Sequence, residues 1–180
     1  PDGRFVICYN GETYNYRELA ASLGLDNLRS SSDTEVVVRG FERIGIGIFP
    51  KLNGIFAVAI YDRLARKAWL ARDRMGVKPL YYRLDDRGLR FGSEIKAILA
   101  AGGDTPSCDL SSLHEWLFYG ASLGGRTLYR DVVQLRPGHC LELDLSTFTV
   151  KVNAFWSLPG ETARSSGRMA SPARAVAETR

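Results

Sequence analysis

The chain has 180 residues, of which 45% are hydrophobic and 24% are charged, and its formal net charge is +4. This composition is ordinary for a soluble globular protein, and the length is enough for one domain with a hydrophobic core. No apolar run approaches the ~20 residues of a membrane-spanning helix, and no basic run interleaved with aromatic residues indicates nucleic-acid binding. We therefore expect neither a membrane nor a nucleic acid as partner.

The cysteines of the chain, Cys8, Cys108 and Cys140, are widely spaced and odd in number. They contain no Cys-x-x-Cys pair, so neither a disulfide framework nor a metal site is expected. A reducing and hence cytoplasmic location follows from this cysteine usage. We expect all three to be buried as small hydrophobic side chains rather than to act as nucleophiles.

The N-terminal part predicts a strand, a turn and a helix. Residues 4–8 have the β-branched and aromatic content of a strand. Asn10-Gly11 tolerates positive φ and predicts a tight turn directly after it. Asn15 can then cap a helix, with Glu18 in the reciprocal capping position. Such a turn exposes backbone N–H groups that suit a small polar ligand, although an isolated Asn-Gly pair is usually only a turn.

A second helix is predicted to begin near Asp33. Ser32 and Glu35 have the spacing of a capping box. The three valines that follow carry some strand preference, but we favour the helix because of its cap. On spacing alone, Asp33 is explained equally well by a favourable interaction with the helix dipole, worth under ~1 kcal/mol.

The middle of the chain predicts an antiparallel meander, because short apolar runs alternate with polar turns. The predicted strands are residues 55–61, 68–71, 80–82 and 89–91. The first is almost continuously apolar, so we expect it to be buried on both faces. The charged residues of 72–78 are either a solvated ion-pair network at the sheet edge or an element that packs against a neighbouring loop or a second domain, and we favour the first, structural role.

The last third predicts two helices and a hairpin. The helices are residues 93–99 and 113–119, and Asp109 or Ser111 can cap the second. Ser93 is interpreted as a helix start rather than as part of a site. Residues 140–145 alternate strictly and predict a half-exposed strand that pairs with 150–156. The core residues that we expect are Val6, Ile7, Leu19, Leu52, Phe56, Val58, Ile60, Leu70, Leu80 and Ile95.

Taken together, these motifs resemble the glutaminase domain, a class II glutamine amidotransferase domain, of glutamine-hydrolysing asparagine synthetases. The matching stretches are residues 10–19, 32–36, 52–57, 71–82 and 91–97, and residues 135–139 and 155–156 match the end of that domain. Several motifs in the same order are far more specific than any one alone. The resemblance covers about residues 1–158.

The resemblance implies an α+β fold of the N-terminal-nucleophile hydrolase type, in which two antiparallel sheets lie between helices in a four-layer αββα arrangement. In that family an N-terminal cysteine thiolate attacks the side-chain amide of glutamine, and its own α-amino group acts as the base. The ammonia passes to a C-terminal synthetase domain of the same polypeptide. There ATP, with Mg²⁺, activates aspartate, so no cofactor is expected in this chain itself.

The family's site residues carry over to four positions. Asn10 matches the side-chain donor of the oxyanion hole and Gly11 matches its backbone N–H donor, and these are the expected catalytic residues. Glu12 and Asp33 match the carboxylates that bind the α-ammonium group of glutamine. Thr13 stands where the family usually has isoleucine, which is a small change in volume.

The largest departure from the family is the nucleophile. The chain begins at Pro1 and lacks both the N-terminal cysteine and the arginine that binds the α-carboxylate of glutamine. Cys8 is no substitute, because it has no free α-amine. We therefore expect residues 1–158 to be an amidotransferase domain without its N-terminal segment, and the chain alone to be inactive. Residues 159–180 are expected to be a linker and the truncated start of a synthetase domain.

The resemblance implies glutamine and the C-terminal synthetase domain as partners, with a homodimer as a further possibility. Two alternatives stay open. One is a degenerate amidotransferase module that keeps the fold without catalysis, and the other is an amidotransferase domain that serves a different synthetase.

Overall fold

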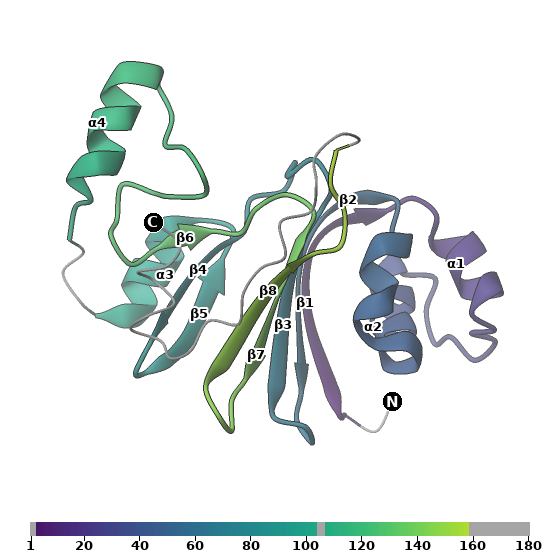
Figure 1. The fold of residues 1–180 in the computed structure, drawn as a ribbon. Helices are drawn as coiled ribbons and strands as arrows, with labels where there is room; N and C mark the ends of the chain where they lie inside the picture. Colours follow the sequence, from purple (N-terminus) through teal and green to yellow (C-terminus); the bar gives the residue numbers. More distant parts are fainter. Residues whose placement is uncertain (1–2, 104–106, 159–180) are drawn as a thin grey trace.

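Two antiparallel sheets stack face to face in the computed structural model, which describes residues 3–103 and 107–158 (Figure 1). The larger sheet has the order β1 (Phe5–Thr13), β2 (Gly54–Asp62), β3 (Lys67–Arg72), β7 (His139–Asp144) and β8 (Thr149–Ala154). The smaller sheet has the order β5 (Gly88–Gly92), β4 (Tyr81–Asp85) and β6 (Val133–Gln134).

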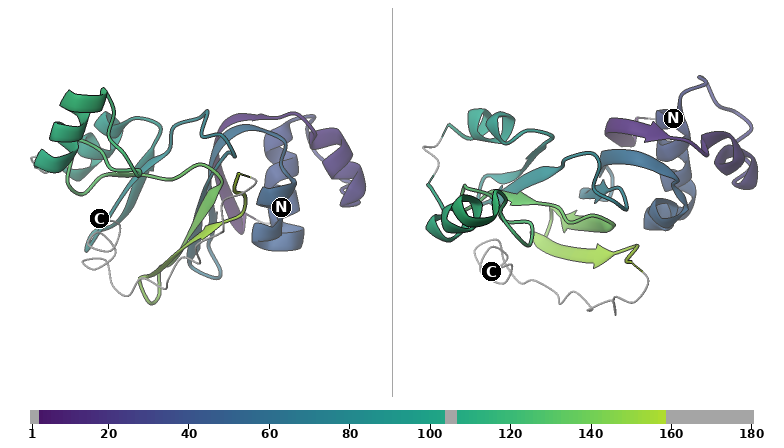
Figure 2. Two further views of the ribbon diagram at one scale, coloured as in Figure 1. Left: turned by 45° about the horizontal axis from the view of Figure 1, so that its top comes forward. Right: turned by 90° about the horizontal axis from the view of Figure 1, so that it is seen from above.

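Helices cover the outer faces of both sheets. The helices and the one 3-10 segment are α1 (Tyr16–Ser22), α2 (Asp33–Ile44), η1 (Gly45–Lys51), α3 (Ile95–Gly102) and α4 (Leu110–Tyr119). In Figure 2, α1 and α2 lie on the side of the larger sheet, and α3 and α4 lie on the side of the smaller one. The expected four-layer αββα arrangement is confirmed. None of the described helices is long and apolar enough to cross a lipid bilayer.

The core is divided between two layers. Phe41, Phe49 and Trp69 belong to the layer between the larger sheet and its helices, and the rings of Phe41 and Trp69 lie 4.8 Å apart. Leu70, Leu84 and Leu141 belong to the layer between the two sheets. A strand buried between the two layers needs apolar residues on both faces. The nearly continuous apolar run of β2 meets this need, as expected.

Strand β1 lies at the edge of the larger sheet and alternates between half-buried and exposed residues. Phe5, Ile7 and Tyr9 pack on the helix side. Val6 and Cys8 therefore point to the opposite face, where Val6 is 42% exposed. The prediction of Val6 as a core residue was wrong, because alternation along an edge strand leaves one face uncovered. Cys8 and Cys108 are exposed and only Cys140 is buried, so the prediction for the cysteines was right only for Cys140.

No turn occurs at Asn10-Gly11, and this prediction was wrong. Strand β1 runs on to Thr13, and Gly11 lies opposite Phe56 of β2. Gly11 has φ +156°, and a Cβ atom built on it would lie 2.1 Å from the carbonyl oxygen of Ile55. Glycine is therefore needed here for close approach of two strands rather than for a turn.

The predicted meander holds only in part. Strands β2 and β3 pair, and so do β4 and β5, but β3 pairs with β7 and not with β4. The chain crosses between the sheets in the charged loop after Arg72. The expected hairpin of β7 and β8 is confirmed. Residues 159–180, expected to be a linker and a helix start, lie outside the described residues.

The helix caps agree with the sequence in position but not always in partner. Ser32 accepts a hydrogen bond from Thr34 N at 3.2 Å, as an N-cap does. Glu35 does not complete the capping box, because its carboxylate accepts from the N–H groups of Arg29 and Ser30. Asn15 sits at the N-cap of α1, yet its side chain bonds the loop before β2 instead.

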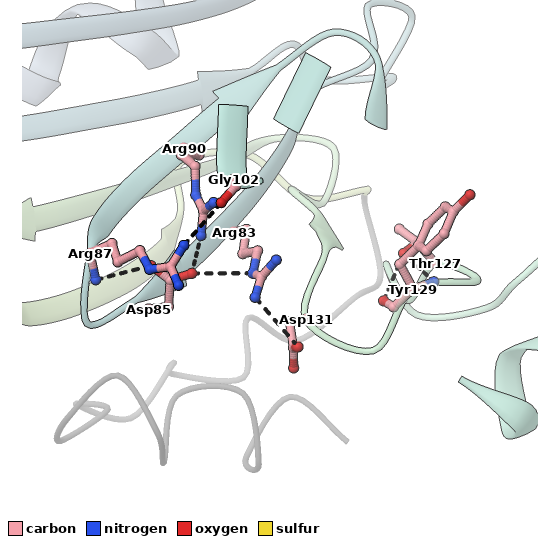
Figure 3. Close-up of polar contacts among 8 residues, drawn as sticks. All are labelled: Arg83, Asp85, Arg87, Arg90, Gly102, Thr127, Tyr129 and Asp131. Carbon is pink, nitrogen blue, oxygen red and sulfur yellow. Dashed lines mark hydrogen bonds and ion pairs between the residues drawn. The ribbon is translucent and has the colours of Figure 1, made fainter. Parts of the chain in front are cut away.

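An arginine cluster lies on the smaller sheet, and one of its members contacts the end of α3 (Figure 3). Arg83 and Arg90 lie opposite each other on β4 and β5, and both contact the carboxylate of Asp85. Arg87 donates to the carbonyl oxygen of Gly102 at the end of α3, at 2.9 Å. Like charges placed opposite each other repel, so Asp85 is needed to hold this pair together.

Candidate functional site

The backbone of Gly11 faces the open edge of the larger sheet. Phe56, opposite it, donates its N–H to Asp73 Oδ2 at 3.2 Å, and its carbonyl oxygen accepts from Asp73 N at 2.8 Å. Both backbone groups of Phe56 therefore point away from β1. Residues opposite each other in an antiparallel pair either bond each other or both point away, so the N–H of Gly11 points out of the sheet.

Thr13 confirms this alternation two residues further along. Its N–H also points away from β2 and donates to Asp33 Oδ2 at 2.8 Å. Asp33 is the first residue of α2, so this bond ties the start of that helix to the end of β1. At the edge of β1, the N–H of Gly11 thus points outward, and the neighbouring outward N–H of Thr13 already donates to the carboxylate of Asp33.

Asn10 lies on the face of β1 that is turned toward the smaller sheet. Its side-chain Nδ2 donates to Ser93 Oγ at 3.0 Å. Ser93 lies in the bend between β5 and α3, and the helix itself begins only at Ile95, after Glu94. The contact joins residues 83 positions apart, and no sequence pattern links them. The interpretation of Ser93 as a helix start missed this contact.

A small polar network surrounds Asp33. The hydroxyl groups of Tyr9 and Thr13 lie 2.7 Å apart. Burial, with smaller contributions from the nearby carboxylates of Asp33 and Glu12, raises the pKa of Tyr9 to about 12, against the lowering effect of the Thr13 hydrogen bond. Both carboxylates therefore act on the same hydroxyl group. Thr13, the departure from the family pattern, supplies a hydroxyl that isoleucine does not have.

The four residues predicted for the site come together. Asn10, Gly11 and Glu12 are consecutive on β1, and Asp33 lies beside Thr13 at its end. The contacts that Tyr9, Thr13 and Ser93 make around these four residues were not predicted. The period-2 alternation of β1 indicates that Tyr9 and Thr13 share a face, but only if the strand is extended through Gly11.

The charged loop after β3 bonds the strand that pairs with β1. The carboxylate of Asp73 accepts the N–H groups of Met75, Val77 and Lys78 in addition to that of Phe56. Arg72 donates to the carbonyl oxygens of Gly76, Lys78 and Leu135, at 2.7 to 2.8 Å. Asp73 and Arg72 are both buried. The role is structural, as expected, but the prediction of a solvated ion-pair network was wrong, because these charges bond to backbone groups.

The donors of Asn10 and Gly11 and the carboxylates beside them determine which chemical groups could bind here. A side-chain N–H₂ group and an adjacent outward backbone N–H can stabilise an oxygen atom that gains negative charge. Two carboxylates beside them can bind a cationic group. A ligand that carries a carbonyl group at one end and an amine at the other matches this distribution.

Comparisons with known proteins agree with this picture. The family model of the glutamine amidotransferase domain matches residues 1–156. Two Bacillus subtilis proteins named asparagine synthetase [glutamine-hydrolyzing] 2 and 3 are similar to this chain. The first is 37% identical over 168 residues, covering 87% of this chain and 22% of its own length. The second is 34% identical over 160 residues, covering 87% and 26%.

Among solved structures, the glutamine phosphoribosylpyrophosphate amidotransferase of B. subtilis has a similar fold. Its TM-score is 0.57 at 20% identity, over 87% of this chain and 30% of that one. This chain spans only about a fifth to a quarter of the length of the two named synthetases. The resemblance drawn from the motifs is confirmed. The chain belongs to the class II glutamine amidotransferase domain family and has its N-terminal-nucleophile hydrolase fold.

Proposed function

We propose that this chain provides the glutamine-binding wall of an amidotransferase site that supplies ammonia to an asparagine synthetase. The names of its relatives support this proposal. The observation that carries it is the outward N–H of Gly11 beside the amide of Asn10, at the open edge of β1.

In the proposed reaction, Asn10 and Gly11 form the oxyanion hole. When a thiolate attacks the side-chain carbonyl carbon of glutamine, the carbonyl oxygen becomes negatively charged. Nδ2 of Asn10 and the N–H of Gly11 donate to it, and the loss of one such donor typically costs ~10²–10³ in rate. The ammonia then leaves as the thioester forms, and water hydrolyses the thioester to glutamate.

Glu12 and Asp33 bind the α-ammonium group of glutamine in this proposal. One oxygen of Asp33 is already held by Thr13 N, which fixes the orientation of the carboxylate. Glu12 is exposed on β1 and free to approach a ligand from the other side. Two acceptors at this point select amino acids over ligands that lack an α-amine.

The attacking thiolate is not part of this wall. The family mechanism needs an N-terminal cysteine whose α-amine, with a pKa of about 7.7–8.0, acts as the base. Cys8 lies within β1, where its nitrogen is part of a peptide bond. We therefore propose that Cys8 is not the nucleophile. Glutaminase turnover that disappears in a Cys8→Ala variant would contradict this.

The synthetase half of the reaction lies with a partner domain. ATP and Mg²⁺ activate the carboxylate of aspartate for attack by ammonia there, and no residue of this chain is assigned to them. The partners proposed for this chain are accordingly glutamine and a synthetase domain, and a homodimer stays a prediction.

The test is an NMR titration of the ¹⁵N-labelled chain with L-glutamine and with 4-carbamoylbutyrate, which lacks the α-amine. Glutamine should shift the backbone amide of Gly11 and the side-chain amide of Asn10. Asp33→Asn keeps an oxygen for Thr13 N–H but loses the charge, so it should weaken glutamine binding about tenfold and leave the weaker 4-carbamoylbutyrate binding unchanged. Glu18→Gln, an exposed change on α1, is the control. No shift at Gly11 with tens of millimolar glutamine would overturn the proposal.

A further inference from the structure

The amide group of Asn10 is held by one side chain of the opposite sheet. Nδ2 donates to Ser93 Oγ at 3.0 Å, and this bond joins β1 to the bend between β5 and α3. Asn10 itself is exposed. An exposed asparagine has no packing to fix its terminal torsion angle, and this torsion is broad and roughly two-fold. Its hydrogen bond to Ser93 is therefore what holds the amide group in one orientation, and Nδ2 is the end that faces Ser93.

We propose that Ser93 is a positioning residue that orients Asn10 as an oxyanion donor, an inference that rests on the proposed function. A side-chain N–H₂ group has two hydrogens. When Ser93 Oγ accepts one, Nδ2 is held toward Ser93 and the second hydrogen stays available for the substrate oxygen. In the flipped orientation Oδ1 would face that oxygen and repel its developing charge.

The backbone around Ser93 is fixed on both sides, which makes it suitable for this role. Gly92, just before it, pairs with Tyr81 of β4. Glu94, just after it, accepts from Ala97 N at 3.2 Å in the first turn of α3. Ser93 thus sits on a junction of strand and helix rather than in a free loop, so its hydroxyl is held in place relative to the smaller sheet.

This contact also makes the donor dependent on how the two sheets are arranged. Gly11 is positioned by β2 and Asp73, within the larger sheet. Asn10 is positioned from the smaller sheet through Ser93. The two donors of the proposed oxyanion hole are therefore set by different layers, and a small shift of one sheet over the other would separate them.

The experiment uses the side-chain amide resonances of Asn10 in the 180-residue chain. In the wild type we expect two well-separated ¹H resonances and a nuclear Overhauser effect from the Asn10 amide to the β-protons of Ser93. Ser93→Ala should bring the two resonances together and speed their exchange with water at least fivefold. Ser93→Thr keeps the hydroxyl and should restore the wild-type pattern. Ser22→Ala removes a serine hydroxyl that bonds Leu19 O on α1, away from the site, and is the matched control.

A second experiment measures the binding of L-glutamate, whose γ-carboxylate places a charged oxygen against the donors of Asn10 and Gly11. Ser93→Ala should weaken glutamate about fivefold, Ser93→Thr should not, and Asn10→Ala should remove any further effect of Ser93→Ala. The inference is overturned if the wild type lacks the Overhauser contact, or if Ser93→Ala leaves the Asn10 resonances unchanged. Failure of the proposed function looks different, because then the wild type binds neither amino acid while the Asn10–Ser93 contact is still observed.

Discussion

Asp73 bonds both backbone groups of Phe56, the residue opposite Gly11, whose own N–H points out of the sheet. The N–H of Asp73 donates to the carbonyl oxygen of Phe56 at 2.8 Å, and its carboxylate accepts the N–H of Phe56 at 3.2 Å. Asp73 is only 1% exposed. The loop after β3, which looks like a surface feature in the sequence, is therefore part of the framework on which the proposed oxyanion hole depends.

We predict that Asp73→Ala lowers the free energy of unfolding by roughly 3 kcal/mol, because it leaves four backbone N–H groups, that of the buried Phe56 among them, without their acceptor. Asp73→Asn keeps one acceptor oxygen and should cost about half as much. Urea denaturation measures both. Asp86→Ala, at an exposed position in the β4–β5 turn, is the control and should change the stability by less than about 0.5 kcal/mol. Equal effects at the two positions would show that the Asp73 network adds nothing.

A second prediction concerns Gly11 and Gly54, because β1 and β2 approach each other closely at both residues. A Cβ atom on either would lie 2.1 Å from a carbonyl oxygen of the other strand, that of Ile55 or that of Glu12. Each alanine substitution should therefore lower the melting temperature by at least ~4 °C, as a loss of 2 kcal/mol or more does in a domain of this size. Gly47→Ala meets nothing closer than 4.0 Å and should have little effect. A Gly11→Ala variant with wild-type stability would contradict the close approach.

The sequence predicted most of the secondary structure, because its signals there are local. The Ser32 and Asp109 caps, the alternation of β7 and the apolar run of β2 all depend on neighbouring residues, and all are confirmed. The pairing of β3 with β7 was not predicted. Nothing within β3 says which of several later strands it will meet.

The four site residues named from the sequence stay a prediction, and the sequence did not give the geometry of the strand that carries three of them. Asn10-Gly11 was taken for a turn because positive φ usually means one, whereas close approach of two strands demands glycine equally. Asp73 was misjudged because charged residues are mostly exposed, and only the tertiary structure supplies the backbone groups that it bonds. Ser93 was missed because its partner is far away in the sequence.

A pH dependence follows from the buried carboxylate of Asp62. Arg4 bonds it through Nε at 3.0 Å and Nη2 at 2.7 Å, and this pair, with the N–H groups of Leu64 and Ala65, holds the pKa of Asp62 below its ordinary value. The unfolded chain therefore binds a proton at a higher pH than the folded one. The stabilisation is present above the ordinary pKa of about 3.9 and is lost as the pH falls through the folded value.

Arg4→Met removes the charge but keeps an apolar stem, so it should shift the acid-unfolding midpoint to higher pH and leave the alkaline limb unchanged. Circular dichroism as a function of pH measures this. Arg63→Met, at an exposed neighbouring position, should leave the midpoint where it is. If both variants shift the acid midpoint equally, general charge and not this ion pair is responsible.

The surface of α4 leads to the last prediction. This helix exposes large apolar side chains on most of its circumference, with Leu117 71% and Phe118 74% exposed, while the residue that it buries fully is Ser112. A contiguous apolar surface of this kind promotes association in water. The double variant Leu117→Lys/Phe118→Glu should therefore reduce concentration-dependent association of the chain in sedimentation velocity. It should change the melting temperature little, because both side chains are mostly exposed and Phe118 loses only its edge contact with the neighbouring ring of Tyr119. Leu64→Glu is the matched control, since Leu64 is 75% exposed but lies alone in the β2–β3 turn. If Leu64→Glu reduces association as much as the double variant does, added charge rather than the α4 surface is the cause.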